Sequence, residues 1–233
     1  MSTYRTLKGY NIKSVTSDPS NTKEGQIWYN DTSNKIRVNT VKPAAWASGG
    51  NLGTARFSMN QGAGTQTAGL FFSGAAGGST SVDTEEYNGT SWSEQNNMAT
   101  GRENMAGCGT QTAGLGFGGY ANPGGASALT EEYDGTSWTA GGNMGAARYS
   151  LGSAGLQTAA LAFGGSPGGV ATTEQYDGSS WTSTASLATA RVQLAGLGTK
   201  TAGLATGGRN PSASNATEEF TDIVNEVTSL DVS

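Results

Sequence analysis

The stretch TEEYDGTSW at 130–138 decides the fold, because nearly the same nine residues occur three times in the chain. They read TEEYNGTSW at 84–92 and TEQYDGSSW at 173–181. Each copy sets Asn-Gly or Asp-Gly between two short segments that carry aromatic residues, which is a strong signal for a β-hairpin. A fourth copy, TEEF at 217–220, has Phe in place of Tyr and no Trp after it.

Each hairpin belongs to a longer unit that repeats four times. An arginine begins each unit, and the arginines follow one another at intervals of 46, 46 and 43 residues. A Thr-rich turn, a short apolar run and a glycine pair separate the arginine from the hairpin. Four short strands per unit are therefore expected, as in a propeller blade. The recurring residues are Arg56, Arg102, Arg148 and Arg191, then Tyr87, Tyr133 and Tyr176, then Trp92, Trp138 and Trp181.

The composition agrees with many short strands joined by tight turns. Glycine, at 37 of 233 residues, is about twice as frequent as in an average protein. Hydrophobic residues make up 35% and charged residues 13% of the chain, so small polar residues must cover much of the surface. The regular aromatic residues argue against disorder. Cys108 is the only cysteine, which excludes an intramolecular disulfide and a cysteine-based metal cluster.

The order of arginine, glycine pair, tyrosine and tryptophan resembles the kelch repeat over roughly residues 46–230. The resemblance implies an all-β fold, a kelch-like β-propeller of four repeats, with an N-terminal arm and hairpin before it. The chain departs from the kelch pattern at Phe220, and it also has polar residues beside the aromatic position, which predict polar contacts between blades. These polar residues are Glu86, Glu132, Gln175 and Glu219.

The closure of such a ring is open at this point. Trp46 and Leu52 are six residues apart, like the Trp and the Met or Leu of the last strand in the other units. This strand could join the C-terminal blade, or residues 25–51 could form a partial fifth blade. An open arc completed by another protomer is the third alternative.

Before the repeats, the chain divides into an extended basic anchoring arm over 1–23 and a β-hairpin with the closing strand over 24–51. The predicted propeller covers 52–233. Residues 1–51 carry seven Lys and Arg and three Asp and Glu, whereas 52–233 carry six and fifteen. The segment EGQIWYNDTSNKIRV at 24–38 alternates on both sides of a turn. It resembles hairpins near the attachment ends of bacteriophage tail-fibre and other virion proteins.

Catalysis is not expected, because the chain has no histidine and its arginines are spread one per unit. We interpret the arginines as structural, each paired with a carboxylate, and the tryptophans as packing residues, with sugar stacking as the alternative. No cofactor and no metal site are predicted. Asp134 and Asp177 offer oxygen ligands in turns, but the spacing matches no calcium loop.

Partner contacts are expected in the parts that vary between repeats and in the arm. The loops after the glycine pairs differ in length and lie where binding loops normally sit. The arm combines aromatic and basic residues, as a docking peptide would. The candidate residues are Tyr120, Asn122, Arg209 and Asn210 in the loops and Tyr4, Arg5, Lys8 and Tyr10 in the arm.

These features predict a non-enzymatic phage virion protein, a tail fibre or a capsid or tail decoration. It would bind other virion proteins through its arm, display the propeller for assembly and for adhesion to a host surface or glycan, and be present in several copies. The alternative is a free-standing kelch-type lectin or protein-interaction adaptor. An acidic body argues against nucleic acid. Without a signal peptide or an apolar span, we expect synthesis in the host cytoplasm and no membrane insertion.

Overall fold

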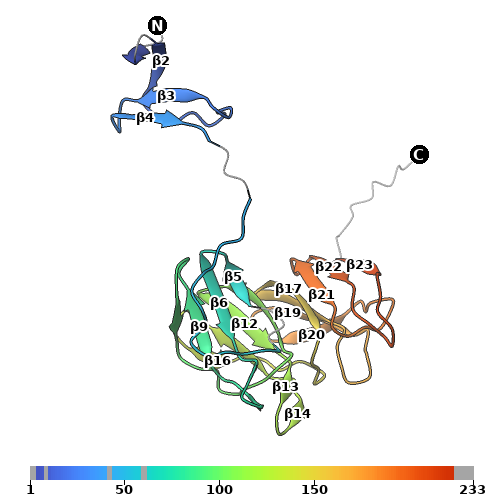
Figure 1. Cartoon of the computed structure of the whole chain (residues 1–233). Coiled ribbons are helices and arrows are strands. Elements are labelled where there is room, and N and C mark those ends of the chain that lie inside the picture. The colour runs from blue at the N-terminus through green and yellow to red at the C-terminus, as the bar shows by residue number, and fades with distance from the viewer. Residues whose placement is uncertain (1–3, 8–9, 41–43, 59–61, 223–233) are drawn as a thin grey trace, which may run out of the picture. The chain divides into compact units, whose positions relative to one another are not determined.

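The computed structural model describes residues 4–7, 10–40, 44–58 and 62–222. They form β-strands joined by turns and loops and contain no helix (Figure 1). Accordingly, no helix in this part of the chain is long and apolar enough to cross a membrane. The chain divides into two compact units, residues 1–48 and 49–233, which are described separately below.

The N-terminal unit is one sheet of four strands. They lie in the order β1 (Tyr4–Leu7), β2 (Tyr10–Val15), β3 (Ile27–Asn30) and β4 (Lys35–Val38). The strands β3 and β4 are the hairpin that the alternating sequence predicts. Instead of an extended arm, β1 and β2 pair as antiparallel strands, and β2 pairs with β3 in parallel. The indole of Trp28 donates to Asp18 at 2.8 Å, and the Asn30 amide does the same.

The second unit contains four antiparallel sheets, one per sequence repeat, which we name sheets I to IV. Sheet I consists of β5 (Ala63–Thr65), β6 (Ala68–Phe72), β9 (Thr84–Tyr87) and β10 (Trp92–Glu94). Sheet II consists of β11 (Ala106–Thr110), β12 (Ala113–Phe117), β15 (Thr130–Tyr133) and β16 (Trp138–Ala140). Sheet III consists of β17 (Gly152–Leu156), β18 (Ala159–Phe163), β19 (Thr173–Tyr176) and β20 (Trp181–Thr184). Sheet IV has three strands, β21 (Ala195–Gly198), β22 (Ala202–Thr206) and β23 (Thr217–Thr221).

Two short strand pairs lie at one edge of this unit. They are β7 (Ala75–Ala76) with β8 (Ser79–Thr80), and β13 (Tyr120–Ala121) with β14 (Gly125–Ala126). The pair β7 and β8 flanks Gly77 and Gly78, whereas β13 and β14 follow Gly118 and Gly119; both belong to the loop between the second and third strands of their sheet. The loops that vary between repeats therefore start from equivalent places in successive sheets.

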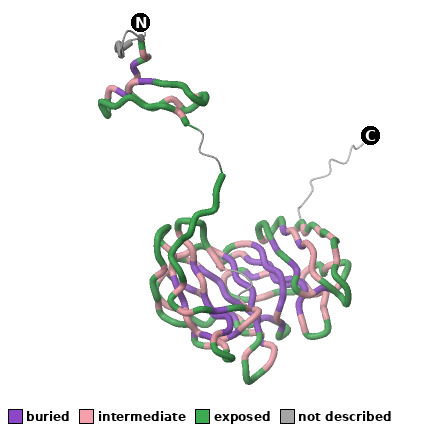
Figure 2. The backbone as a smooth tube through the Cα atoms, viewed as in Figure 1, coloured by how far each residue is buried: buried purple, intermediate pink, exposed green. Residues whose placement is uncertain are grey.

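The four sheets stack face to face in sequence order. Their first strands β5, β11, β17 and β21 are neighbours in that order, and sheets I and IV lie at the two ends of the stack (Figure 1). The buried residues are concentrated on the strands of this unit, and its outer loops are mostly exposed (Figure 2). The buried residues form three clusters: one around Leu70, Phe72 and Met98, one around Leu115, Phe117 and Met144, and one around Leu161, Phe163 and Leu194.

Glycines let the sheets approach closely. A Cβ atom on Gly114 would lie 2.5 Å from Leu70 Cδ2, and one on Gly203 would lie 2.7 Å from Leu161 Cδ1. The leucine of one sheet thus packs against a glycine of the next. This explains a high glycine content in a chain with a buried core. The predicted all-β class is confirmed, while the described residues form no closed barrel.

We expect Leu161→Ala to lower the free energy of unfolding by about 2–5 kcal/mol, because the side chain is fully buried. The matched control is Leu156→Ala on the same sheet, where the leucine is 56% exposed. This control should change stability by no more than about 0.5 kcal/mol. Urea titration followed by tryptophan fluorescence measures both, and equal effects would contradict the stacked core described above.

Candidate functional site

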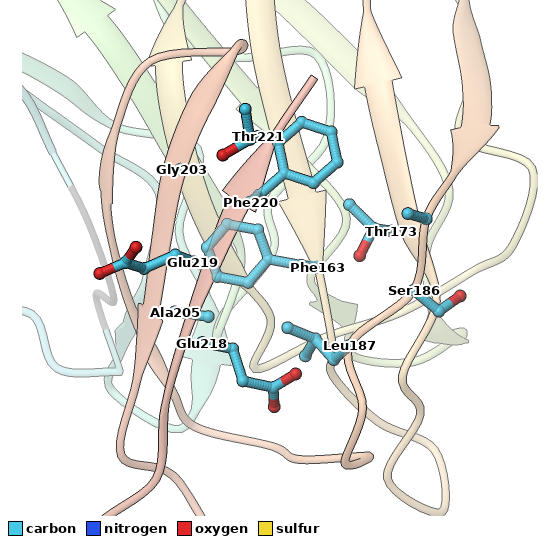
Figure 3. Close-up of a pocket in the computed structure, with 11 residues that line it drawn as sticks. Phe163, Thr173, Ser186, Leu187, Gly203, Ala205, Glu218, Glu219, Phe220 and Thr221 are labelled. Carbon is cyan, nitrogen blue, oxygen red and sulfur yellow. The ribbon is translucent and has the colours of Figure 1, made fainter. Parts of the chain in front are cut away.

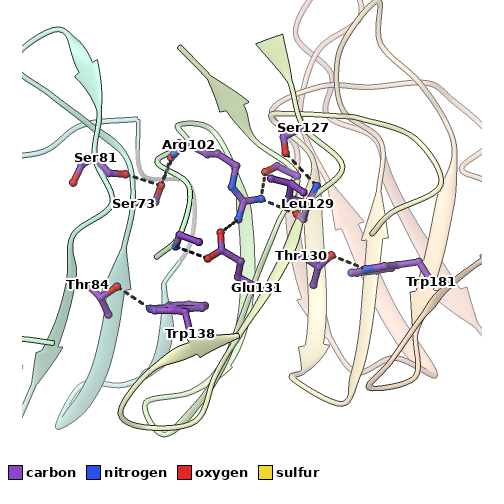
Figure 4. A network of polar contacts seen from close by, with 12 residues as sticks. Ser73, Ser81, Thr84, Arg102, Ser127, Leu129, Thr130, Glu131, Trp138 and Trp181 are labelled. Carbon is purple, nitrogen blue, oxygen red and sulfur yellow. Dashed lines mark hydrogen bonds and ion pairs between the residues drawn. The ribbon is translucent and has the colours of Figure 1, made fainter. Parts of the chain in front are cut away.

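The four repeated arginines occupy equivalent buried places in the four sheets. In sheet II, Arg102 Nη1 donates to the carbonyl oxygens of Gly118 and Leu129, each at 2.7 Å (Figure 4). Its Nη2 atom binds Glu131 Oε1 at 2.8 Å. The second oxygen of Glu131 accepts the backbone N–H of Ala99 at 2.7 Å. Because Ala99 lies between sheets I and II in the chain, one arginine and one glutamate fix the connection between consecutive sheets.

The same pair recurs in the other three sheets. The nitrogen to oxygen distances are 2.6 Å for Arg56 and Glu85, 2.6 Å for Arg148 and Glu174, and 2.7 Å for Arg191 and Glu218. In sheets I and III the glutamate also accepts a backbone N–H, from Gly53 at 2.7 Å and from Gly145 at 2.6 Å.

Burial defines the role of these arginines. Desolvation lowers the pKa of Arg102 and Arg148, and the facing glutamates oppose this shift. The guanidinium groups stay charged because each has a carboxylate and two carbonyl acceptors of its own repeat. Their remaining Nε atoms have no partner and are buried. All of this indicates that the arginines hold strands together and do not face a ligand.

Tyrosine and glutamate join neighbouring sheets. The Tyr133 hydroxyl of sheet II donates to Glu86 Oε1 of sheet I at 2.9 Å. The Tyr176 hydroxyl of sheet III donates to Glu132 of sheet II in the same way. Burial raises the pKa of both tyrosines, and the bonds to the carboxylates raise it further. Glu86 and Glu132, the polar residues beside the aromatic position of each repeat, therefore each form a bond between sheets.

The tryptophans also join neighbouring sheets. Trp138 Nε1 of sheet II donates to Thr84 Oγ1 of sheet I at 2.9 Å, and its ring contacts Phe72 at a centroid distance of 4.9 Å (Figure 4). Trp181 Nε1 of sheet III donates to Thr130 Oγ1 of sheet II at 2.9 Å. Both indoles are engaged inside the stack, which favours a packing role over sugar stacking for these two.

The contact between sheets III and IV differs from the other two. Phe220 has no hydroxyl to donate, and the residue of sheet III that is equivalent to Glu86 and Glu132 is Gln175, whose buried Nε2 atom has no partner. A glutamate at this place would be a partly buried charge without a donor, so glutamine and phenylalanine fit together. Where a tryptophan would lie there is a cavity of about 150 Å³, lined by Phe163, Thr173 and Leu187 among others (Figure 3).

The candidate contact residues in the loops lie at the surface. Arg209 and Asn210 are exposed and line a groove with Ser166, Gly168 and Gly169 of the preceding repeat. Arg209 Nε donates to Gln193 at 2.8 Å, and Asn210 Nδ2 donates to the Ala190 carbonyl at 2.9 Å. These bonds orient both side chains. Among the described residues, the other two guanidinium nitrogens of Arg209 have no hydrogen-bond partner.

Tyr120 and Asn122 extend from the equivalent loop of sheet II. The Tyr120 ring packs edge-on against Tyr149 with centroids 5.4 Å apart, and Asn122 is exposed. Of the candidate residues in the arm, Tyr4 and Arg5 lie on β1, Tyr10 begins β2, and Lys8 lies outside the described residues. The loops thus provide the described part of the candidate binding surface.

The aspartates of the turns accept hydrogen bonds from backbone N–H groups. Asp134 accepts the N–H groups of Thr136 and Ser137, and Asp177 accepts those of Ser179 and Ser180. These bonds lower the pKa of Asp177 to about 2. Within the described ranges, no group of three or more His, Cys, Asp or Glu side chains could hold a metal ion.

A repeated glutamine escaped the sequence analysis. Gln111 Nε2 of sheet II donates to the carbonyls of Gly69 and Tyr87 in sheet I, at 3.2 and 2.8 Å. Gln157 of sheet III binds sheet II in the same way. The recurrence of Gln before Thr-Ala in these turns is the signal that would have found it.

No protein-family model matches the chain, and a search of curated proteins finds no match.

We expect Glu131→Ala to lower the free energy of unfolding by about 3–5 kcal/mol, because it leaves the buried Arg102 charge without its partner. Arg209→Ala is the control, since it removes an exposed cation whose described contact is a single side-chain bond. Its expected effect is below about 1 kcal/mol. Thermal denaturation of the three proteins compares them, and a loss confined to the Arg209 variant would contradict the structural role of the buried pair.

Proposed function

We propose that the chain is a non-enzymatic bacteriophage virion protein whose four stacked sheets are the blades of a kelch-like propeller. The observation that carries this proposal is the use of the repeated side chains. The arginines, glutamates, tyrosines and tryptophans that recur are engaged mainly with their own or a neighbouring sheet. What differs between repeats is the set of loops at one edge, and variable loops on a rigid scaffold are the usual place for binding.

Three features support the propeller. Each sheet has its strands in sequence order from the first to the last, and the first strands adjoin one another across sheets. Sheets I, II and III are tied in series by the same contacts. The repeated unit is a single sheet, of four strands in sheets I to III and of three in sheet IV, and radial repetition of four-stranded sheets is the propeller architecture.

Adhesion to a glycan fits the chemistry of the loops. The groove beside Arg209 and Asn210 offers a guanidinium, an amide and backbone groups of glycine-rich loops. Groups of this kind bind sugar hydroxyls and carboxylates by directed hydrogen bonds. Tyr120 adds an aromatic face at the equivalent loop of sheet II.

Attachment to other virion proteins is assigned to the N-terminal unit. Residues 1–48 form a compact unit of their own, and the positive charge of the chain gathers in this part. A basic module followed by an acidic one suits a protein that is anchored at one end and displays the other.

A free-standing lectin or adaptor is the second candidate, and the same loop groove supports it. In the virion proposal, antiserum against the chain labels purified phage particles at a defined place. A protein lacking residues 1–48 should fail to join the particle but keep its glycan binding. Absence of label on particles, with the protein found only in the lysate, would favour the lectin or adaptor.

For the binding surface, we expect the double variant Arg209→Ala, Asn210→Ala to weaken binding to a glycan array at least about tenfold, equal to about 1.4 kcal/mol. The control is Lys35→Ala, which removes an exposed cation from the N-terminal unit. Unchanged binding by the double variant would place the glycan site elsewhere, and loss by the control alone would assign it to the N-terminal unit.

A further inference from the structure

The two ends of the stack expose the two halves of the contact that joins its interior sheets. Between sheets I and II, three residues of the earlier sheet meet three of the later one: Leu70 with Gly114, Thr84 with Trp138, and Glu86 with Tyr133. The threonine and glutamate contacts recur between sheets II and III. Sheets I and II therefore each have a trailing face with Leu, Thr and Glu, and sheets II and III each have a leading face with Trp and Tyr.

Sheet IV retains the trailing face although no later sheet of the described residues covers it. Leu204 pairs with Glu219 in the strand register, as Leu70 pairs with Glu86 in sheet I. Thr217 and Glu219 are exposed. On the first strand, Leu197 is 63% exposed, whereas the equivalent Ala154 of sheet III is 4% exposed.

Sheet I retains the leading face although no earlier sheet of the second unit covers it. Tyr87 and Trp92 stack with a centroid distance of 4.9 Å and an interplanar angle of 38°. The interior pair Tyr176 and Trp181 has 4.9 Å and 36°. Tyr87, Trp92, Phe71 and Gly69 line an open groove. The leading face is thus formed in advance, in the geometry that it has inside the stack.

The substitutions between sheets III and IV show that this retention is selective. There, glutamate and tyrosine have changed together, to Gln175 and Phe220. At the two ends of the stack, Glu219 and Tyr87 are still the residue types that bond across an interior sheet contact. The two residue types are thus replaced together at one contact and kept together at the two ends. This indicates that Glu219 and Tyr87 meet in a further contact.

A strand with tryptophan is also missing from sheet IV and present at the start of the repeats. The cavity beside Phe163 and Thr173 corresponds to the place that Trp138 and Trp181 fill at the other two contacts. The segment WASGGNL at 46–52 matches WTAGGNM at 138–144, the last strand of sheet II with its continuation. Trp46 is fully exposed. The next residue, Gly53, already donates to Glu85, as Gly145 donates to Glu174.

We infer that a second copy of this chain docks end to end on the first. The leading face of its sheet I covers the trailing face of sheet IV, and its segment 46–52 pairs with β23 and places Trp46 against Phe163 and Thr173. Repeating the contact at the other end closes the pair of chains. Four sheets from each copy give eight, the upper end of the usual range for propellers.

Reach favours a second copy over the same chain. Gly50 is held against Thr90 of sheet I, because a Cβ there would lie 2.7 Å from the Thr90 oxygen. Four residues of extended chain span at most about 14 Å. The first strands β5, β11, β17 and β21 contact one another in that order, so sheets II and III separate sheet IV from sheet I of the same chain. The segment 46–52, held at sheet I, therefore meets the sheet IV of another copy.

The test is the mass of the full chain in solution, by light scattering across a concentration series. We expect twice the mass of one chain. Glu219→Arg and Trp46→Ala should each raise the dissociation constant of the pair at least tenfold, while Glu24→Arg, the same charge change at an exposed site of the N-terminal unit, should not. Both key residues are exposed in the single chain, and circular dichroism checks that the variants fold.

Acrylamide quenching of wild type against Trp46→Phe reports whether Trp46 is buried, and it separates the outcomes. The inference rests on the propeller part of the proposed function. A single-chain mass with Trp46 protected overturns the inferred pair, but it agrees with a propeller that closes within one chain. A single-chain mass with Trp46 accessible overturns both. A pair insensitive to both variants, or an assembly larger than two copies, also overturns the inference and leaves the virion role to its own test.

Discussion

Arginine buried in every repeat imposes the condition that the rest of the second unit satisfies. A guanidinium withdrawn from water needs a carboxylate and further acceptors, because an isolated buried charge is very costly. Here the carboxylate comes from the third strand and the carbonyls from the two ends of the loop that precedes it. Since the same glutamate also accepts an N–H from the preceding connection, the ion pair links strand order, turn position and the path between sheets. A small, glycine-rich unit thereby acquires one defined arrangement.

Sequence periodicity was sufficient for the strands, because the Asn-Gly and Asp-Gly turns and the repeat length are local signals. The hairpin at 24–38 and the three hairpins of TEEYNGTSW type could be predicted in this way. The pairing of β1 with β2 could not, because the segment 4–15 has no comparable turn signal. The two glutamates of each tetrad have different roles, one toward the arginine and one toward the next tyrosine. Alternation along a strand puts them on opposite faces, but only the stacking shows which neighbours they meet.

The candidate site was predictable only as a set of loops. Their variability identified Tyr120, Asn122, Arg209 and Asn210, but not the groove that Arg209 and Asn210 form with the loop of the preceding repeat. That groove depends on the distance between consecutive sheets, which packing sets. The role of the repeated glutamine was hidden for a similar reason, since its acceptors are backbone carbonyls of another repeat. A long-range contact with a main-chain atom leaves no partner residue to recognise in the sequence.

The change from glutamate and tyrosine to Gln175 and Phe220 has a consequence for how the stack comes apart. In a linear array, stability is shared between the units and the contacts of neighbours. The contact between sheets III and IV has neither the phenol to carboxylate bond nor the indole to threonine bond of the other two. Local opening starts where such contacts are fewest. In a single chain, sheet IV is therefore the end of the array that opens most easily while sheets I to III keep their order, and amide exchange would be fastest there.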